Sequence, residues 1–119
     1  MKLSKELRDR TKTFAAKVIR LYVSLPKQKE EVRVVGRQLL RSGTSVAAHA
    51  REASRARSDV EFCSKLGGLL QEADESQLWL ELLAEECGIS DEAMNFLCGE
   101  ADELIAIFTT IVSKVKNKE

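Results

Sequence analysis

Proline and aromatic residues are scarce in this chain. Its 119 residues include one proline, and aromatic side chains make up 5%. Leucine, alanine, glutamate, lysine and arginine are abundant, and these residues favour helices. The composition therefore predicts an all-α protein. Because 44% of the residues are hydrophobic and 32% are charged, we expect one globular domain over 1–119.

Long apolar runs are also missing. No stretch of about 18 apolar residues occurs, so we expect no membrane span. The first residues carry lysine and glutamate and lack the apolar segment of a secretory signal. These two absences favour a cytoplasmic location.

Groups that perform catalysis or hold metals are few. His49 is the only histidine, so one chain can form neither a Ser-His pair nor a histidine metal cluster. We interpret His49 as a polar residue on the flank of a helix. Gly43-Thr44-Ser45 lacks the earlier glycine and the lysine of a phosphate-binding loop. We therefore expect no enzyme activity, no metal and no cofactor.

The three cysteines form no C-x-x-C motif, and their odd number argues against a disulfide framework. We interpret Cys63, Cys87 and Cys98 as buried or half-buried thiols. Neighbouring carboxylates such as Glu85-Glu86 point in different directions on a helix, so we interpret them as solvated.

Apolar residues recur at helical spacing in four segments. Pro26 follows the first segment and suits the first turn of the second. Ser58 starts the third segment, Gly88 is placed to end it, and Ser90 is placed to cap the fourth. The predicted helices span about 3–24, 27–55, 59–87 and 91–116. Their short connections predict an antiparallel, up-down-up-down four-helix bundle.

The second predicted helix has an unusually small buried seam. Its positions, three and four residues apart, are Val32, Gly36, Leu39, Gly43, Val46, Ala50 and Ala53. Glycine in a helix interior costs about 1 kcal/mol relative to alanine, so these glycines suggest a close neighbouring backbone. If the second and third helices pair about residue 56 or 57, Gly67-Gly68 lies opposite Ser45-Val46. We therefore expect Gly43, Ala47 and Ala50 to pack against these glycines.

Residues 78–83, Leu-Trp-Leu-Glu-Leu-Leu, place apolar side chains around nearly the whole helix. A helix that is apolar all round is buried on more than one side. In a bundle of four helices the second cover would come from another subunit. We therefore predict a homo-oligomer with Leu78, Trp79 and Leu82 at its interface. The other interpretation is a monomer with Trp79 half exposed.

Charge is balanced over the whole chain but not along it. Residues 1–60 hold 15 basic and 6 acidic side chains, and residues 61–119 hold 4 and 13. In the basic half, arginines follow the second helix as a stripe: Arg33, Arg37, Arg41, Arg51, Arg55 and Arg57. They suit successive phosphates of RNA or DNA. The alternative, equally consistent with the sequence, is that these arginines form ion pairs with acidic side chains of the third helix.

Hydroxyl side chains accompany these arginines at Ser42, Thr44 and Ser45. In a helix interior such hydroxyls often donate to a carbonyl one turn earlier, and we expect that use here. Contact with a ligand is the other use open to the exposed ones.

Several segments together resemble the 23S rRNA intervening-sequence protein family. The similarity covers about residues 8–112, and its most specific parts are Leu-Leu-Arg-Ser-Gly-Thr-Ser-Val at 39–46 and Trp-Leu-Glu-Leu-Leu at 79–83. Ala47 and His49 stand where members commonly have glycine and asparagine. The resemblance implies an antiparallel bundle in a ring, typically a homopentamer, from the bacterial cytoplasm. A related group consists of basic accessory proteins of diversity-generating retroelements, which bind nucleic acid and a reverse transcriptase.

The residues and the resemblance together predict a non-enzymatic, ring-forming scaffold that binds RNA or another nucleic acid through the arginine stripe. A protein-interaction module that serves a partner protein and binds no nucleic acid is the alternative.

Overall fold

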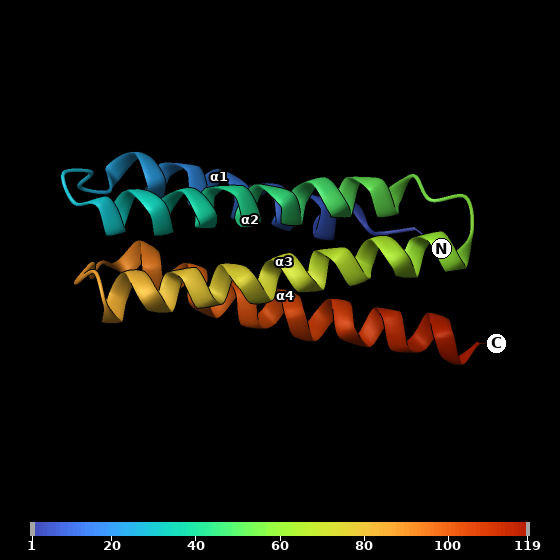
Figure 1. The fold of residues 1–119 in the computed structure, drawn as a ribbon. Coiled ribbons are helices and arrows are strands. Elements are labelled where there is room, and N and C mark those ends of the chain that lie inside the picture. Colours follow the sequence, from blue (N-terminus) through green and yellow to red (C-terminus); the bar gives the residue numbers. More distant parts are fainter. Residues whose placement is uncertain (1, 119) are drawn as a thin grey trace.

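The computed structural model describes residues 2–118 and contains four helices there, with no strand. They are α1 (Lys5–Ser24), α2 (Glu30–Ser54), α3 (Asp59–Glu85) and α4 (Glu92–Asn117). The all-α prediction is confirmed. Figure 1 shows α1 and α2 lying above α3 and α4, with both chain ends at the same end of the molecule. The α1–α2 and α3–α4 connections lie at the opposite end. The molecule measures 50 × 21 × 20 Å.

The helix ends follow the predicted caps with two exceptions. The Ser58 hydroxyl accepts from the Glu61 amide at the start of α3, and Gly88 has a φ of +69° just beyond its end. At α4, however, Asp91 rather than Ser90 is the cap, and its carboxylate accepts from the Met94 amide. Asp91 adds its charge where the helix dipole is positive, which a serine cannot do.

The predicted start of α2 at residue 27 is three residues early. Pro26 lies in the connection and not in the first turn of α2. The connection also holds Lys27, whose ammonium donates to the carbonyls of Tyr22, Val23 and Leu25 and so caps the end of α1. At Lys29 the backbone is still extended, with a φ of −93° and a ψ of 132°. The helix starts instead at Glu30, with acids suited to its positive end.

The predicted seam of α2 is confirmed, because all seven of its positions are buried. The expected packing of its glycines against Gly67-Gly68 is wrong. A Cβ on Gly43 would lie 2.8 Å from both methyl groups of Val18, so this glycine faces α1. Gly68 receives the ring of His49, and a Cβ on Gly67 would meet nothing within 4 Å.

Hydroxyl groups connect α2 to α3 in the core. The Thr44 hydroxyl donates to the Leu40 carbonyl, as expected, and the Ser42 oxygen lies 3.3 Å from the Leu39 carbonyl. The Ser42 hydroxyl also lies 2.8 Å from that of Ser76, and both residues are fully buried.

The apolar segment of α3 is covered only in part. Leu80 and Leu83 are buried, whereas Leu78 is 46% exposed. Trp79 and Leu82 are half-buried. The indole nitrogen of Trp79 is buried without a hydrogen-bond partner among the described residues. None of the helices described is long and apolar enough to cross a membrane.

Candidate nucleic-acid interface

Three of the six stripe arginines have carboxylate partners. Arg33 lies 2.8 Å from Glu30 and donates to the Lys27 carbonyl at 2.9 Å. The hydrogen bond between Arg33 and Glu30 raises the pKa of the arginine and lowers the pKa of the carboxyl. Arg41 reaches across to Glu75 on α3.

The Arg41–Glu75 distance is 3.5 Å, and Arg57 lies 3.6 Å from Glu61. Both of these pairs are largely exposed, and exposed pairs are weak. Arg37 is exposed and makes no ion pair within residues 2–118. Its charge nevertheless contributes to the lowered pKa of Glu30. The three arginines with partners are therefore less available to a ligand than the remaining three.

Arg51 and Arg55 line a large open hollow at the end of the bundle that holds the chain termini. It has a volume of about 1030 Å³. Its walls come from the start of α1, the end of α2 and the start of α3. The lining residues are Lys5, Arg8, Asp9, Thr11, Lys12, Ala47, Ala48, Ala50, Arg51, Glu52, Ser54, Arg55, Glu61 and Lys65. We call this hollow the α1–α2 groove.

All three carboxylates of the α1–α2 groove are already engaged. Asp9 lies 2.7 Å from Lys5, and this hydrogen bond is the main cause of its lowered pKa. Glu52 lies 3.8 Å from Lys65. Its Oε1 atom is also 3.2 Å from the His49 Nδ1, although in a geometry that is not a hydrogen bond.

The third carboxylate, Glu61, is paired with Arg57. This leaves four exposed cations on the groove wall without an ion-pair partner within residues 2–118: Arg8, Lys12, Arg51 and Arg55. Arg8 and Lys12 are one turn apart on α1, and Arg51 and Arg55 are one turn apart on α2. The groove is therefore a concentrated, accessible positive surface.

The α1 part of this surface was missed at the sequence level. The stripe was placed along one helix, so its interpretation did not include Arg8 and Lys12. The excess of basic residues in 1–60 was the available signal, because it covers the first helix as well as the second. The packing of α1 beside α2 joins the two sets of charges.

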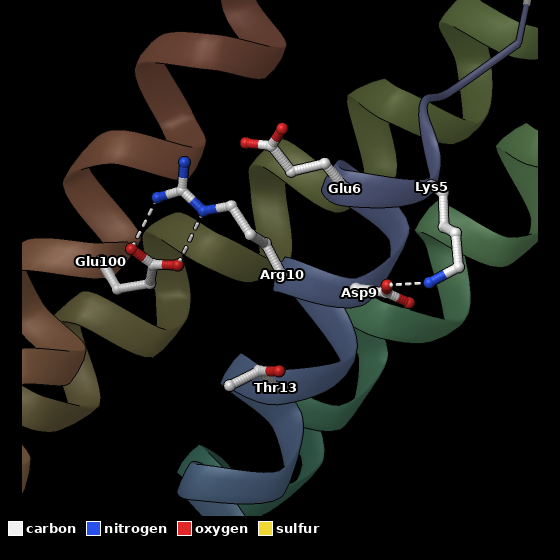
Figure 2. A pocket seen from close by; sticks show the side chains of 6 residues that line it. All are labelled: Lys5, Glu6, Asp9, Arg10, Thr13 and Glu100. Atoms are coloured by element: carbon white, nitrogen blue, oxygen red, sulfur yellow. Dashed lines mark hydrogen bonds and ion pairs between the residues drawn. The ribbon is translucent and has the colours of Figure 1, made fainter.

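A smaller hollow of about 510 Å³ lies between α1 and α4. Figure 2 shows the Arg10 guanidinium turned toward Glu100 and the Lys5 ammonium toward Asp9. The Arg10 Nε and Nη2 atoms donate to the two carboxylate oxygens of Glu100 at 3.0 and 2.7 Å. This contact raises the pKa of Arg10. Arg10 thus connects two helices and is not free to hold an anion.

The remaining candidate groups are metal-ligating side chains and the three cysteines. Among residues 2–118 no group of three histidine, cysteine or acidic side chains could hold a metal ion. Cys63, Cys87 and Cys98 are free and half-buried. Burial raises the pKa of the Cys87 and Cys98 thiols, and nearby carboxylates raise it further.

Comparison with known proteins identifies relatives. No curated protein matches the chain. A crystal structure at 1.70 Å resolution of a protein with unknown function, from the S23 ribosomal protein family of Bacteroides thetaiotaomicron VPI-5482, is 36% identical. The match covers 90% of this chain and 95% of that one, with a TM-score of 0.81. The family model described as 23S rRNA-intervening sequence protein matches residues 5–110. The chain therefore belongs to the 23S rRNA-intervening sequence protein family.

Proposed function

We propose that this protein is a non-enzymatic scaffold that binds nucleic acid through the α1–α2 groove. One observation carries the proposal. Arg8, Lys12, Arg51 and Arg55 lie exposed on one groove, and every carboxylate of that groove has another partner. A cation that is not already neutralised can replace the counterions of a phosphate, and the released counterions drive binding.

A binding assay at low salt with a labelled RNA hairpin tests this function. The wild-type protein is expected to bind, and the variant Arg51→Gln/Arg55→Gln to bind more weakly. The variant Arg33→Gln/Arg41→Gln is the matched control, because it removes as many charges from ion-paired positions outside the groove and leaves the groove carboxylates with their partners. Absence of binding to both RNA and DNA at low salt would refute the proposal.

The protomer in this proposal is an antiparallel bundle, and the working form is a cytoplasmic homo-oligomeric ring, a homopentamer by analogy with the family. Leu78, Trp79 and Leu82 are its proposed contact surface. The exposed Leu78 and the incomplete burial of Trp79 and Leu82 support this assignment. Light scattering should give a multiple of the 13.3 kDa chain mass. The variant Leu78→Glu/Leu82→Glu should lower that mass.

The same apolar surface supports a second candidate function. A protein partner could cover Leu78 and Trp79, and the chain would then be an accessory subunit like those of diversity-generating retroelements. Affinity purification separates the two functions. Co-purified material that nuclease removes favours the scaffold for nucleic acid. A stoichiometric protein partner that is lost from Leu78→Glu and retained after nuclease treatment favours the accessory subunit.

A further inference from the structure

Aromatic side chains are absent from the lining of the α1–α2 groove. Phe14, Phe62 and Phe108 are fully buried in the core. The rings of Tyr22 and Phe96 lie beneath the ammonium groups of Lys27 and Lys17. Trp79 is half-buried on α3, outside the groove. These are all six aromatic residues of the chain, so the groove has no aromatic ring on which a base could stack.

The uncharged polar groups of the groove are also occupied. The Thr11 hydroxyl donates to the Arg8 carbonyl at 2.9 Å, and the Ser54 hydroxyl donates to the Ala50 carbonyl at 3.0 Å. The other uncharged lining residues are alanines. No amide side chain lines the groove, although asparagine and glutamine are the residues that recognise adenine. Reading of base edges would therefore fall to the long cationic side chains alone.

The four free cations form a compact set. Positions four residues apart on a helix are separated by about 6 Å along its axis. The axes of neighbouring packed helices are about 8–10 Å apart. Two turns of α1 and α2 thus present Arg8 and Lys12 opposite Arg51 and Arg55. This spread along and across the two helices suits several phosphates of one backbone.

We infer that the ligand of the α1–α2 groove is the phosphate backbone itself, bound without regard to base or sugar. Inorganic polyphosphate, which has neither, should occupy the same groove. This inference rests on the proposed function and makes it more specific. The groove offers charge for phosphates, no aromatic surface for bases, and no amide side chain or unused hydroxyl proton for a ribose.

Competition tests the inference. Labelled RNA hairpins of equal length and unrelated sequence, and the corresponding DNA hairpins, are bound at one fixed low salt concentration. Inorganic polyphosphate is then added as competitor. The RNA hairpins should bind with affinities within about threefold of one another, because a specific base contact would contribute roughly 5- to 150-fold. DNA should bind as RNA does, and polyphosphate should displace both.

The same experiments on Arg51→Gln/Arg55→Gln and on the control Arg33→Gln/Arg41→Gln show which surface holds the ligand. The affinity for polyphosphate and the affinity for RNA should both fall in the first variant and stay unchanged in the second. Helical circular dichroism checks that both variants are folded, and exposed residues of this kind tolerate the change.

The outcomes separate the inference from the function. If RNA binds through the groove but one sequence is preferred tenfold, or polyphosphate fails to compete, the inference is wrong and the proposed function stands. Loss of all nucleic-acid binding at low salt refutes both. Binding that Arg51→Gln/Arg55→Gln leaves unchanged also refutes both, because another surface would then hold the ligand.

Discussion

The hydroxyl oxygens of Ser42 and Ser76 lie 2.8 Å apart in the core, between α2 and α3. Ser76 donates its one proton to the Glu72 carbonyl within its own helix, so in the pair the Ser42 hydroxyl is the donor and Ser76 accepts. Two buried hydroxyls can pair in this way only when the two helices keep one alignment. The same alignment brings Arg41 to Glu75 and Lys65 to Glu52. It therefore contributes to which cations are paired and which remain free.

We predict that Ser42→Ala and Ser76→Ala are each destabilising by about 1 kcal/mol, because each leaves a buried hydroxyl with one partner fewer. The loss of unfolding free energy in the double variant should be smaller than the sum of the two single losses, since the shared contact is removed only once. Urea unfolding of the four proteins measures the coupling. Ser64→Ala, at an exposed position of α3, is the control and should change little. Strictly additive effects would show that the hydroxyl pair contributes nothing to stability.

Gly43→Ala should also destabilise the protein. Alanine is the better helix former by about 1 kcal/mol. A Cβ at residue 43 would, however, lie 2.8 Å from both methyl groups of Val18, and overpacking of this kind costs about 1–3 kcal/mol. Thermal unfolding measures the difference. In a Val18→Ala background the substitution should cost less stability, because only the Cβ of residue 18, at 3.1 Å, would remain close.

The matched control is Gly99→Ala on α4, where a Cβ would meet nothing within 4 Å. This change should stabilise the protein by about 0.5–1 kcal/mol. If Gly43→Ala raised the melting temperature as much as Gly99→Ala, the close approach of α1 to α2 would be disproved.

The Arg10–Glu100 pair predicts that lysine at position 10 gives a less stable protein than arginine. The side chains are 27% and 13% exposed, and the contact has two hydrogen bonds. Arg10→Ala should cost about 2 kcal/mol, because hydrogen bonds to charged groups contribute about 1.5–3 kcal/mol. Arg10→Lys should recover only part of this, since lysine cannot form the two-pronged contact. Chemical unfolding tests the order, and equal stability of the lysine and arginine proteins would contradict it.

Cys98 predicts a loss of stability at alkaline pH. Burial first, and then Glu81 and Asp102, raise the pKa of its thiol above the ordinary value. The folded state therefore holds this proton more tightly than the unfolded state. Its contribution is fully present below the unfolded pKa and is lost as the pH rises through the folded pKa.

The free energy of unfolding should thus decline above a pH of about 8.5, the ordinary thiol pKa. The free energy of unfolding of Cys98→Ala should decline less steeply over the same range, and the difference isolates the contribution of this thiol. Identical pH profiles for the two proteins would exclude the effect.

Much of the fold was predictable because its signals are local. Seven small or apolar positions on α2, the Ser58 cap and Gly88 all depend on neighbours within a few residues. The predicted start of α2 was wrong. Lys27 lies in the connection and reaches back to α1, a contact that helix periodicity does not register. The predicted packing partner of Gly43 was wrong because residue spacing alone does not show whether α1 or α3 packs against this face of α2.

The candidate site likewise has a part that was predictable from the sequence and a part that was not. Arg51 and Arg55 were recognisable as members of a stripe, but ion pairing could not be assigned without the alignment of α2 with α3. Arg8 and Lys12 joined them only once α1 was placed beside α2. Charge along one helix was therefore predictable, and charge across two helices was not.

The salt dependence of RNA binding tests the central claim most directly. Each phosphate contact contributes about −0.9 to the slope of log affinity against log salt for a duplex, so four cations give about −3.6 per protomer. Arg51→Gln/Arg55→Gln should flatten the slope by about 1.8, while Arg33→Gln/Arg41→Gln, whose partners lie outside the groove, should leave it nearly unchanged. Equal slopes in the two variants would contradict the assignment of nucleic-acid binding to the α1–α2 groove.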